Sequence, residues 1–153
     1  MCNVLHEIPP NEWLTLFSQD SLIYRALKES GYVLIVEDQR IPTGERAHQF
    51  GFLVLDSPHL RTLFGITSAD IGKNLFLSHD FRSDGRLKAH LISKSLLGRI
   101  SSETRRKAIS ELQATAKDQI RRTRLQPPSY LIGQMHGFWT QQFANASLYL
   151  EET

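Results

Sequence analysis

The histidines are the residues best suited to chemistry in this sequence, and their spacing limits what they can do. There are six of them: His6, His48, His59, His79, His90 and His136. No two stand in a His-x-x-x-His arrangement and no His-Glu-x-x-His string occurs, so a zinc site on a helix is not predicted. The single cysteine, Cys2, excludes an internal disulfide and a four-cysteine zinc site. We therefore expect no bound metal.

The loops that bind phosphate or present a nucleophile are missing from the sequence. It contains no Gly-x-Gly-x-x-Gly, no Gly-x-x-x-x-Gly-Lys-Ser and no Gly-x-Ser-x-Gly string. These strings mark dinucleotide-binding proteins, nucleoside triphosphatases and α/β-hydrolases. We expect a protein that binds a partner rather than an enzyme of one of these classes.

Positive charge is concentrated in one segment of the chain. Between residues 99 and 124 there are eight Lys or Arg and three acidic residues, a net of +5, so the rest of the chain sums to −3. Such a stripe could follow the phosphate backbone of a nucleic acid. The alternative is a solvated face of an amphipathic helix, with the aliphatic stems covering the edge of the core.

Length and composition place the chain among single-domain proteins. It has 153 residues and a formal net charge of +2. The hydrophobic residues make up 41% of the chain, which is enough to fill one core. The longest unbroken apolar run, Tyr32 to Val36, is far shorter than the roughly 18 residues of a membrane span. No signal segment opens the chain. We expect a soluble, cytoplasmic protein with no membrane partner.

Hydrophobic spacing and turn residues predict the elements of the first half. An amphipathic helix over 10–31, broken near its middle, is followed by buried strands at 32–36 and 50–55. A helix is predicted over 57–65, because Asp-Ser-Pro stands at its start and Gly at its end. A second, short helix is predicted over 67–71.

The second half is predicted to be helical first and then extended. Leucine spacing predicts a helix over 87–98, and the longest helix begins at 101 or 102 and ends before Pro127-Pro128. The last quarter has many aromatic residues and few charges, and glycines and an asparagine interrupt it. We expect three short strands there, over 130–132, 138–143 and 147–150.

This order predicts an α+β fold with an antiparallel sheet of about five strands and helices on one face. The N-terminal helix precedes the sheet. We divide the chain into a flexible N-terminus over 1–9, the N-terminal helix over 10–31 and a single α+β domain over 32–153.

The string from Ser57 to Lys73, SPHLRTLFGITSADIGK, resembles the corresponding turn of PAS domains. It has a short helix ending in an aromatic-Gly pair, a polar stretch and an apolar-Gly-Lys step, and the element order is similar too. The resemblance implies a sensory or regulatory domain of a bacterial transcription or signalling regulator, which acts by binding a small ligand or a partner and by dimerisation.

The PAS resemblance also implies particular site residues. Ile109, Leu112 and Trp139 would line a ligand pocket beneath the long helix, and His90 could be an axial haem ligand. Core packing is the alternative role for each of them. A homodimer would form through the N-terminal helix, at the three apolar residues Trp13, Phe17 and Leu27, unless the sheet of the same chain covers them.

A second resemblance rests on short strings in a shared order: Trp13-Leu14, Asp20-Ser21 with Arg25, Leu60-Arg61, Leu97-Gly98-Arg99, Gly137-Phe138-Trp139 and Glu152. They occur in the order seen in chorismate pyruvate-lyases, which are small α+β enzymes with a buried arginine and glutamate. The resemblance implies that Arg61 holds a substrate carboxylate, through its bidentate guanidinium, and that Glu152 is the acid. It predicts a buried Arg61–Glu152 pair, whereas a binding role predicts Arg61 exposed on a short helix.

Overall fold

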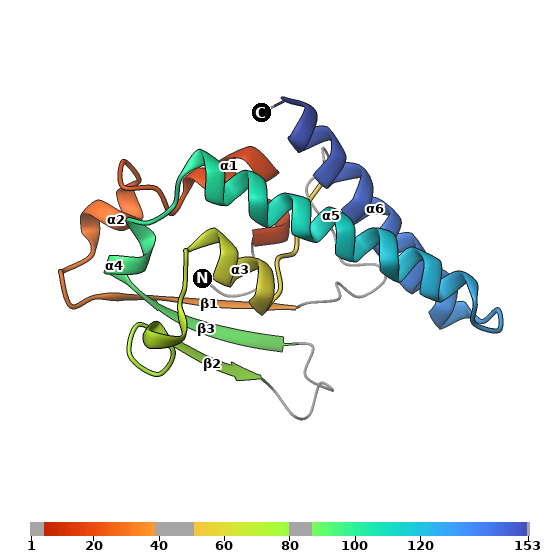
Figure 1. The fold of residues 1–153 in the computed structure, drawn as a ribbon, viewed down its shortest axis with the longest axis horizontal. Coiled ribbons are helices and arrows are strands. Elements are labelled where there is room, and N and C mark those ends of the chain that lie inside the picture. Colours follow the sequence, from red (N-terminus) through yellow and green to blue (C-terminus); the bar gives the residue numbers. More distant parts are fainter. Residues whose placement is uncertain (1–4, 39–50, 80–86, 153) are drawn as a thin grey trace.

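The computed structural model describes residues 5–38, 51–79 and 87–152 (Figure 1). The elements are, in order, η1 (Leu5–Glu7), α1 (Pro10–Thr15), α2 (Leu22–Ala26), β1 (Tyr32–Asp38), α3 (Ser57–Leu63), η2 (Ser68–Asp70), β2 (Leu75–His79), β3 (Leu87–Ser93), α4 (Lys94–Leu97), α5 (Ser102–Arg124) and α6 (Tyr130–Glu152). None of the helices in these ranges is long and apolar enough to cross a membrane.

The sheet has three antiparallel strands in the order β1-β3-β2. The α+β class is confirmed, but the expected five-stranded sheet is wrong, since the described residues form three strands. The inner face of the sheet buries Val33 and Ile35 of β1. Ile92 and His90 of β3 lie opposite these two residues.

The central strand β3 corrects the helix that was expected over 87–98. Leu87 and Leu91 are four residues apart, and this spacing places two side chains on one face of a helix. In a strand, residues an even number apart also share a face. The backbone over 87–93 is extended between β1 and β2, and only 94–97 are helical.

The turn from α3 to β2 follows its local signals. Asp56 is the N-cap of α3, with Pro58 in the first turn, and Gly65 ends the helix with a φ of 57°, a backbone conformation that favours glycine. Thr67 caps η2 through a reciprocal bond with Asp70. Asp70 also accepts two hydrogen bonds from Arg99, at 2.8 and 3.1 Å, which join this turn to the segment before α5.

The long basic helix is confirmed as α5. Ser101 is its N-cap and accepts from the amide of Thr104, which satisfies one of the free donors of the first turn. The buried residues repeat at helical spacing; they are Ala108, Ile109, Leu112, Ala116 and Thr123. This face packs against α3 and α6, and the basic side chains largely remain outside.

One 23-residue helix, α6, replaces the three strands expected at the C-terminus. Gly133 and Gly137, which we expected to separate strands, lie where an added Cβ would meet nothing within 4 Å. Glycine in a helix interior costs about 1 kcal/mol relative to alanine, but packing against α5 offsets such a cost. The result is a long α5–α6 hairpin, joined by residues 125–129.

The apolar run at 51–55 is extended but is not a strand of the sheet. Side-chain amides of α6 hold its backbone: Val54 N donates to Gln142 Oε1 at 2.8 Å, and Phe52 O accepts from Gln142 Nε2 and Asn145 Nδ2 at 3.2 and 2.8 Å. Gln142 is fully buried. Its amide supplies the donor and the acceptor that a neighbouring strand would otherwise provide.

The N-terminus over 1–9, expected to be flexible, is described from residue 5 onward, and Leu5 belongs to the core. Leu5 and His6 are buried, and the Leu5 amide donates to Glu37 of β1 at 3.2 Å. The expected helix over 10–31 consists of two short helices, α1 and α2, with the break near Ser21, which is the N-cap of α2. Residues 1–4, including Cys2, lie outside the described part of the chain.

The molecule is layered, with α3 between the inner face of the sheet and α5 (Figure 1). The core fills this space with side chains from the sheet, α1, α3, α4 and α5. The α5–α6 hairpin extends past the sheet, so that its turn lies at one end of the longest axis of the molecule (Figure 1).

Candidate functional site

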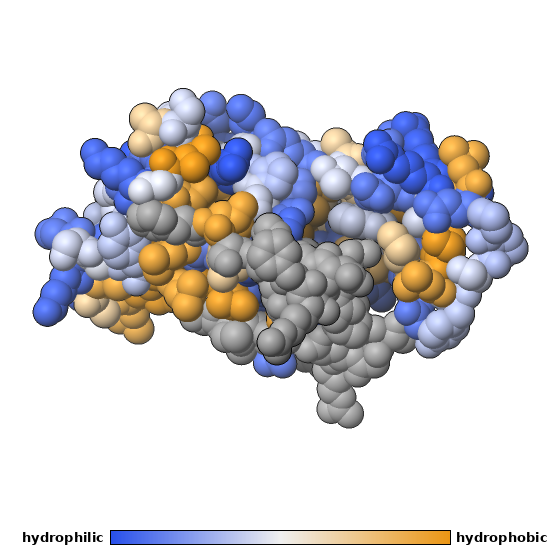
Figure 2. Space-filling view, turned by 90° about the horizontal axis from the view of Figure 1, so that it is seen from below, coloured by the Kyte–Doolittle hydropathy of each residue, from blue (hydrophilic) through white to orange (hydrophobic). Residues whose placement is uncertain are grey.

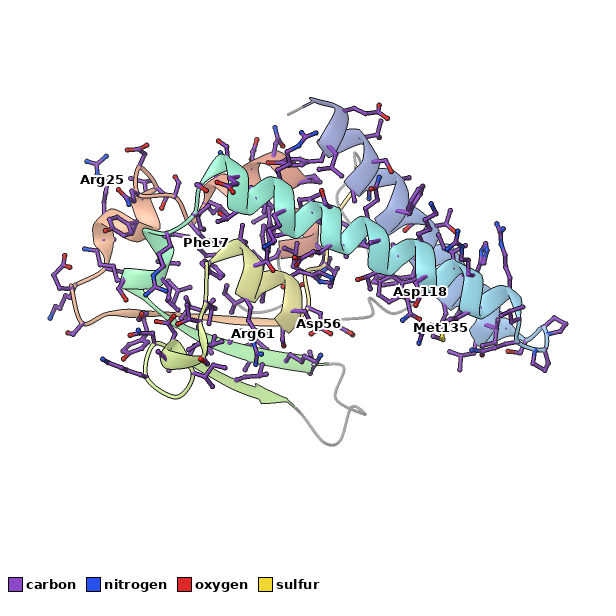
Figure 3. All side chains as sticks on the ribbon, in the orientation of Figure 1. Phe17, Arg25, Asp56, Arg61, Asp118 and Met135 are labelled. Carbon is purple, nitrogen blue, oxygen red and sulfur yellow. The ribbon has the colours of Figure 1, made fainter. Side chains whose placement is uncertain are left out.

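Polar side chains meet where the start of α3 faces β3. We call this the α3–β3 cluster; it consists of Asp56, Ser57, His59, Lys88 and His90. Lys88 Nζ lies 2.5 Å from Asp56 Oδ1, and Ser57 Oγ lies 3.0 Å from His90 Nε2. Figure 3 shows Asp56 at the start of α3, above the sheet. Burial acts to raise the pKa of Asp56, but hydrogen bonds from Lys88 and Ser57 outweigh it and lower this pKa.

The Ser57–His90 contact has the atoms of a nucleophile and its base, so its protonation state decides what it can do. Burial, with smaller contributions from Lys88 and Arg61, lowers the pKa of His90 to about 4, although Asp56 acts to raise it. The ring is therefore neutral at pH 7. Its Nδ1 is buried and has no partner among the described residues. A proton on Nε2, donated to Ser57 Oγ, avoids leaving a buried N–H unpaired.

In that tautomer His90 donates to the serine and does not accept its proton, which is the reverse of what a general base does. The first backbone amides of α3 are also engaged. Ser57 N and His59 N donate to the Asp56 carboxylate, and Leu60 N donates to the Asp56 carbonyl. Pro58 has no N–H. The cluster thus lacks a donor at α3 that could stabilise an oxyanion.

His59 is satisfied in its neutral form. Its Nδ1 accepts from the Asp56 amide at 3.2 Å, and its Nε2 lies 3.2 Å from Thr115 Oγ1, which itself donates to the Glu111 carbonyl. Burial lowers the pKa of His59, although Asp56 and Glu111 act to raise it. This histidine joins α3 to α5 and is a structural residue.

A second buried pair ties the N-terminus to β1. His6 Nδ1 lies 2.6 Å from Glu37 Oε1, and both side chains are buried. Glu37 lies opposite Lys88 in the register of β1 and β3, so this pair adjoins the α3–β3 cluster. Among the described residues, no group of three His, Cys, Asp or Glu side chains could hold a metal ion. Nε2 of His90, the residue considered as an axial haem ligand, lies 3.0 Å from Ser57 Oγ.

The residues expected to line a ligand pocket lie on two different helices, α5 and α6. Ile109 and Leu112 are fully buried in the core beneath α5. Trp139 belongs to α6, where it is half-buried and packs edge-to-face on Phe138 with 5.0 Å between ring centroids.

The N-terminal residues expected to form a dimer interface are largely internal. Trp13 and Phe17 are 2% and 0% exposed and belong to the core, so the chain covers them itself, and Leu27 packs half-buried against the same core. Arg61 is exposed on the short helix α3, as expected of a binding role. The side chain of Glu152, its expected partner, lies outside the described residues.

Exposed basic and apolar side chains gather at the turn of the α5–α6 hairpin. We call residues 117–131 the hairpin end. Its exposed cations are Lys117, Arg121, Arg122 and Arg124, and its exposed apolar residues are Leu125, Tyr130 and Leu131. Figure 2 shows hydrophobic and hydrophilic residues side by side at this end of the molecule. Sequence reasoning found the cations but missed the apolar residues, because it placed Tyr130 and Leu131 in a strand.

Comparison with known proteins finds no relative of this chain. A scan against protein-family models, a search of curated proteins and a search of solved structures each find no match for the chain. No relative therefore supports or contradicts the resemblances to PAS domains and to chorismate pyruvate-lyases.

Proposed function

We propose that this chain is a regulatory binding protein that docks a negatively charged partner at the hairpin end. One observation carries the proposal: from Gln119 to Leu150 the sequence has three arginines and no Asp or Glu, and all three are exposed at one end of the molecule. The hairpin end has four exposed cations and one acid, Asp118, which pairs with Arg122. Such an excess of positive charge attracts anionic surfaces and steers their approach.

The proposal retains partner binding as the mode of action and moves the contact from the N-terminal helix to the hairpin. The α3–β3 cluster supports this choice, because His90 donates to Ser57 instead of accepting its proton and the first amides of α3 are engaged, so it favours a structural role over turnover. The turn of the hairpin is also the part of the described fold farthest along the longest axis from the sheet (Figure 1). A partner can reach it without displacing the core.

Retention on immobilised heparin, a polyanion, tests the proposal. The variant Arg121→Glu with Arg124→Glu should elute at clearly lower salt than the wild-type chain, because salt screens exposed charges and fewer of them remain. The control is Arg25→Glu with Lys28→Glu, which changes net charge by the same amount at exposed residues. Figure 3 shows Arg25 at the opposite end of the molecule from the hairpin turn.

The control should elute close to the wild-type chain. Equal shifts for the two double variants would show that retention follows net charge alone, and the proposed site would then be wrong. A wild-type chain that does not bind heparin at low salt would also contradict it.

A further inference from the structure

The hairpin end carries apolar side chains that a purely ionic contact does not need. Leu125, Tyr130 and Leu131 are 87%, 80% and 62% exposed, and they stand within seven residues of one another. Single exposed leucines are common on protein surfaces, but grouped ones mark contact sites. The partner of the hairpin end therefore offers apolar as well as anionic groups.

The turn that presents these side chains is ordered by its own hydrogen bonds. Leu125 N donates to the Arg122 carbonyl, at 3.2 Å. Ser129 Oγ accepts from Ile132 N at 3.2 Å, and the Ser129 carbonyl accepts from Gly133 N at 2.9 Å. Because both helix ends are fixed in this way, a contact made here has little ordering cost.

The arginines stand directly behind the apolar residues along α5. Arg122 pairs with Asp118 at 2.7 Å, and both side chains remain more than half exposed. Arg124 Nε donates to His136 Nε2 of α6 at 3.2 Å. Arg121 is exposed on the same stretch of helix. The hairpin end thus has exposed apolar residues at its turn and exposed arginines on the last turn of α5.

We infer that the hairpin end docks on the surface of an anionic lipid bilayer, an inference that rests on the proposed function and names its partner class. Leucine and tyrosine side chains would enter the boundary between headgroups and acyl chains, where tyrosine is enriched, and the arginines would lie among the lipid phosphates. A nucleic acid would engage the arginines but would leave the leucines in water. Contact is from the surface, since none of the described helices can span a membrane, and the inference replaces the sequence-based expectation of no membrane partner.

Flotation with vesicles tests the inference. The probes are vesicles of phosphatidylcholine alone and of phosphatidylcholine with about one third phosphatidylglycerol. The wild-type chain should float with the anionic vesicles and not with the neutral ones. The triple variant Leu125→Ser, Tyr130→Ser and Leu131→Ser should bind the anionic vesicles at least tenfold more weakly, with unchanged retention on heparin and an unchanged circular dichroism spectrum.

The arginine variants provide the second arm. Near an anionic surface each arginine contributes about fivefold to binding, so Arg121→Glu with Arg124→Glu should abolish flotation, whereas Arg25→Glu with Lys28→Glu should retain it. Wild-type binding of the triple serine variant to anionic vesicles would overturn the inference. Binding to a duplex DNA oligonucleotide but not to vesicles would overturn it too and leave the proposed function standing. Binding to neither vesicles, DNA nor heparin would refute both.

Discussion

Acid should destabilise this protein through His90, by an amount that follows from its burial. The pKa of His90 is about 4 in the folded chain and about 6.5 in an unfolded one. The unfolded state therefore binds the proton more readily, and stability falls as the pH drops from about 6.5 towards 4. At about 1.36 kcal/mol for each pKa unit, the full effect is roughly 3 kcal/mol. About 2 kcal/mol of it falls between pH 7 and pH 4.5.

Urea unfolding of the wild-type chain and of His90→Gln, at a series of pH values, measures this effect. Glutamine can donate to Ser57 in the same way but does not titrate. The free energy of unfolding of His90→Gln should therefore fall by about 2 kcal/mol less than that of the wild type between pH 7 and pH 4.5. Other groups titrate in both chains and cancel in the comparison.

The variant Ser57→Ala separates burial from hydrogen bonding as the cause. It removes the partner of Nε2 but leaves the imidazole buried, so it should keep the steep pH dependence of the wild-type chain. Parallel pH profiles for His90→Gln and the wild type would refute the reasoning, because they would show that His90 is as easily protonated in the folded state as in the unfolded one.

Three further outcomes follow from the same geometry. Leu112→Ala should lower the free energy of unfolding by about 2–5 kcal/mol through the cavity it leaves, while Ala114→Ser on the exposed face of α5 should change it little; equal effects would place Leu112 outside the core. Phe17→Glu should unfold the chain, as measured by circular dichroism, because it buries a charge. If the wild type is a dimer and this variant is a folded monomer, Phe17 lies at an interface instead. Ser57 should not be labelled by a fluorophosphonate at neutral pH, and labelling that is lost in His90→Gln would show an active nucleophile.

Local signals in the sequence predicted the parts of the fold that depend on neighbouring residues. The start of α3 at Asp56, its end at Gly65 and the start of α5 at Ser101 all have side chains or glycine conformations that act within a few residues. The buried stripe of α5 was also predicted, since periodicity over many turns distinguishes a helix from a strand.

The errors lie where tertiary contacts outweigh local preference. Glycines and aromatic residues made 130–150 resemble strands, but Gln142 and Ala146 are buried at a helical spacing of four, and packing on α5 stabilises the helix. The run at 51–55 has the composition of a strand, yet its backbone partners are side chains that begin 88 residues later. No pattern confined to 51–55 can report such a partner.

The site was predicted only in part for the same reason. The cations of the hairpin end were visible in the charge balance, but their placement beside Tyr130 required the correct assignment of α6. The Ser57–His90 contact was missed because 87–98 was expected to be a helix. A strand at that position brings His90 beneath the start of α3, where its ring is buried.

The hydrogen bond that the Val54 backbone amide donates to the Gln142 side chain makes one backbone hydrogen a reporter for the docking of the hairpin. Val54 N donates to a side chain of α6, not to a strand, so this hydrogen exchanges with solvent only when α6 leaves the 51–55 segment or Gln142 turns away. Its exchange rate in D₂O therefore measures how often the hairpin undocks from the core. If a partner that binds at the distant turn shifts α6, the exchange rate of the Val54 amide hydrogen changes although the partner does not contact Val54.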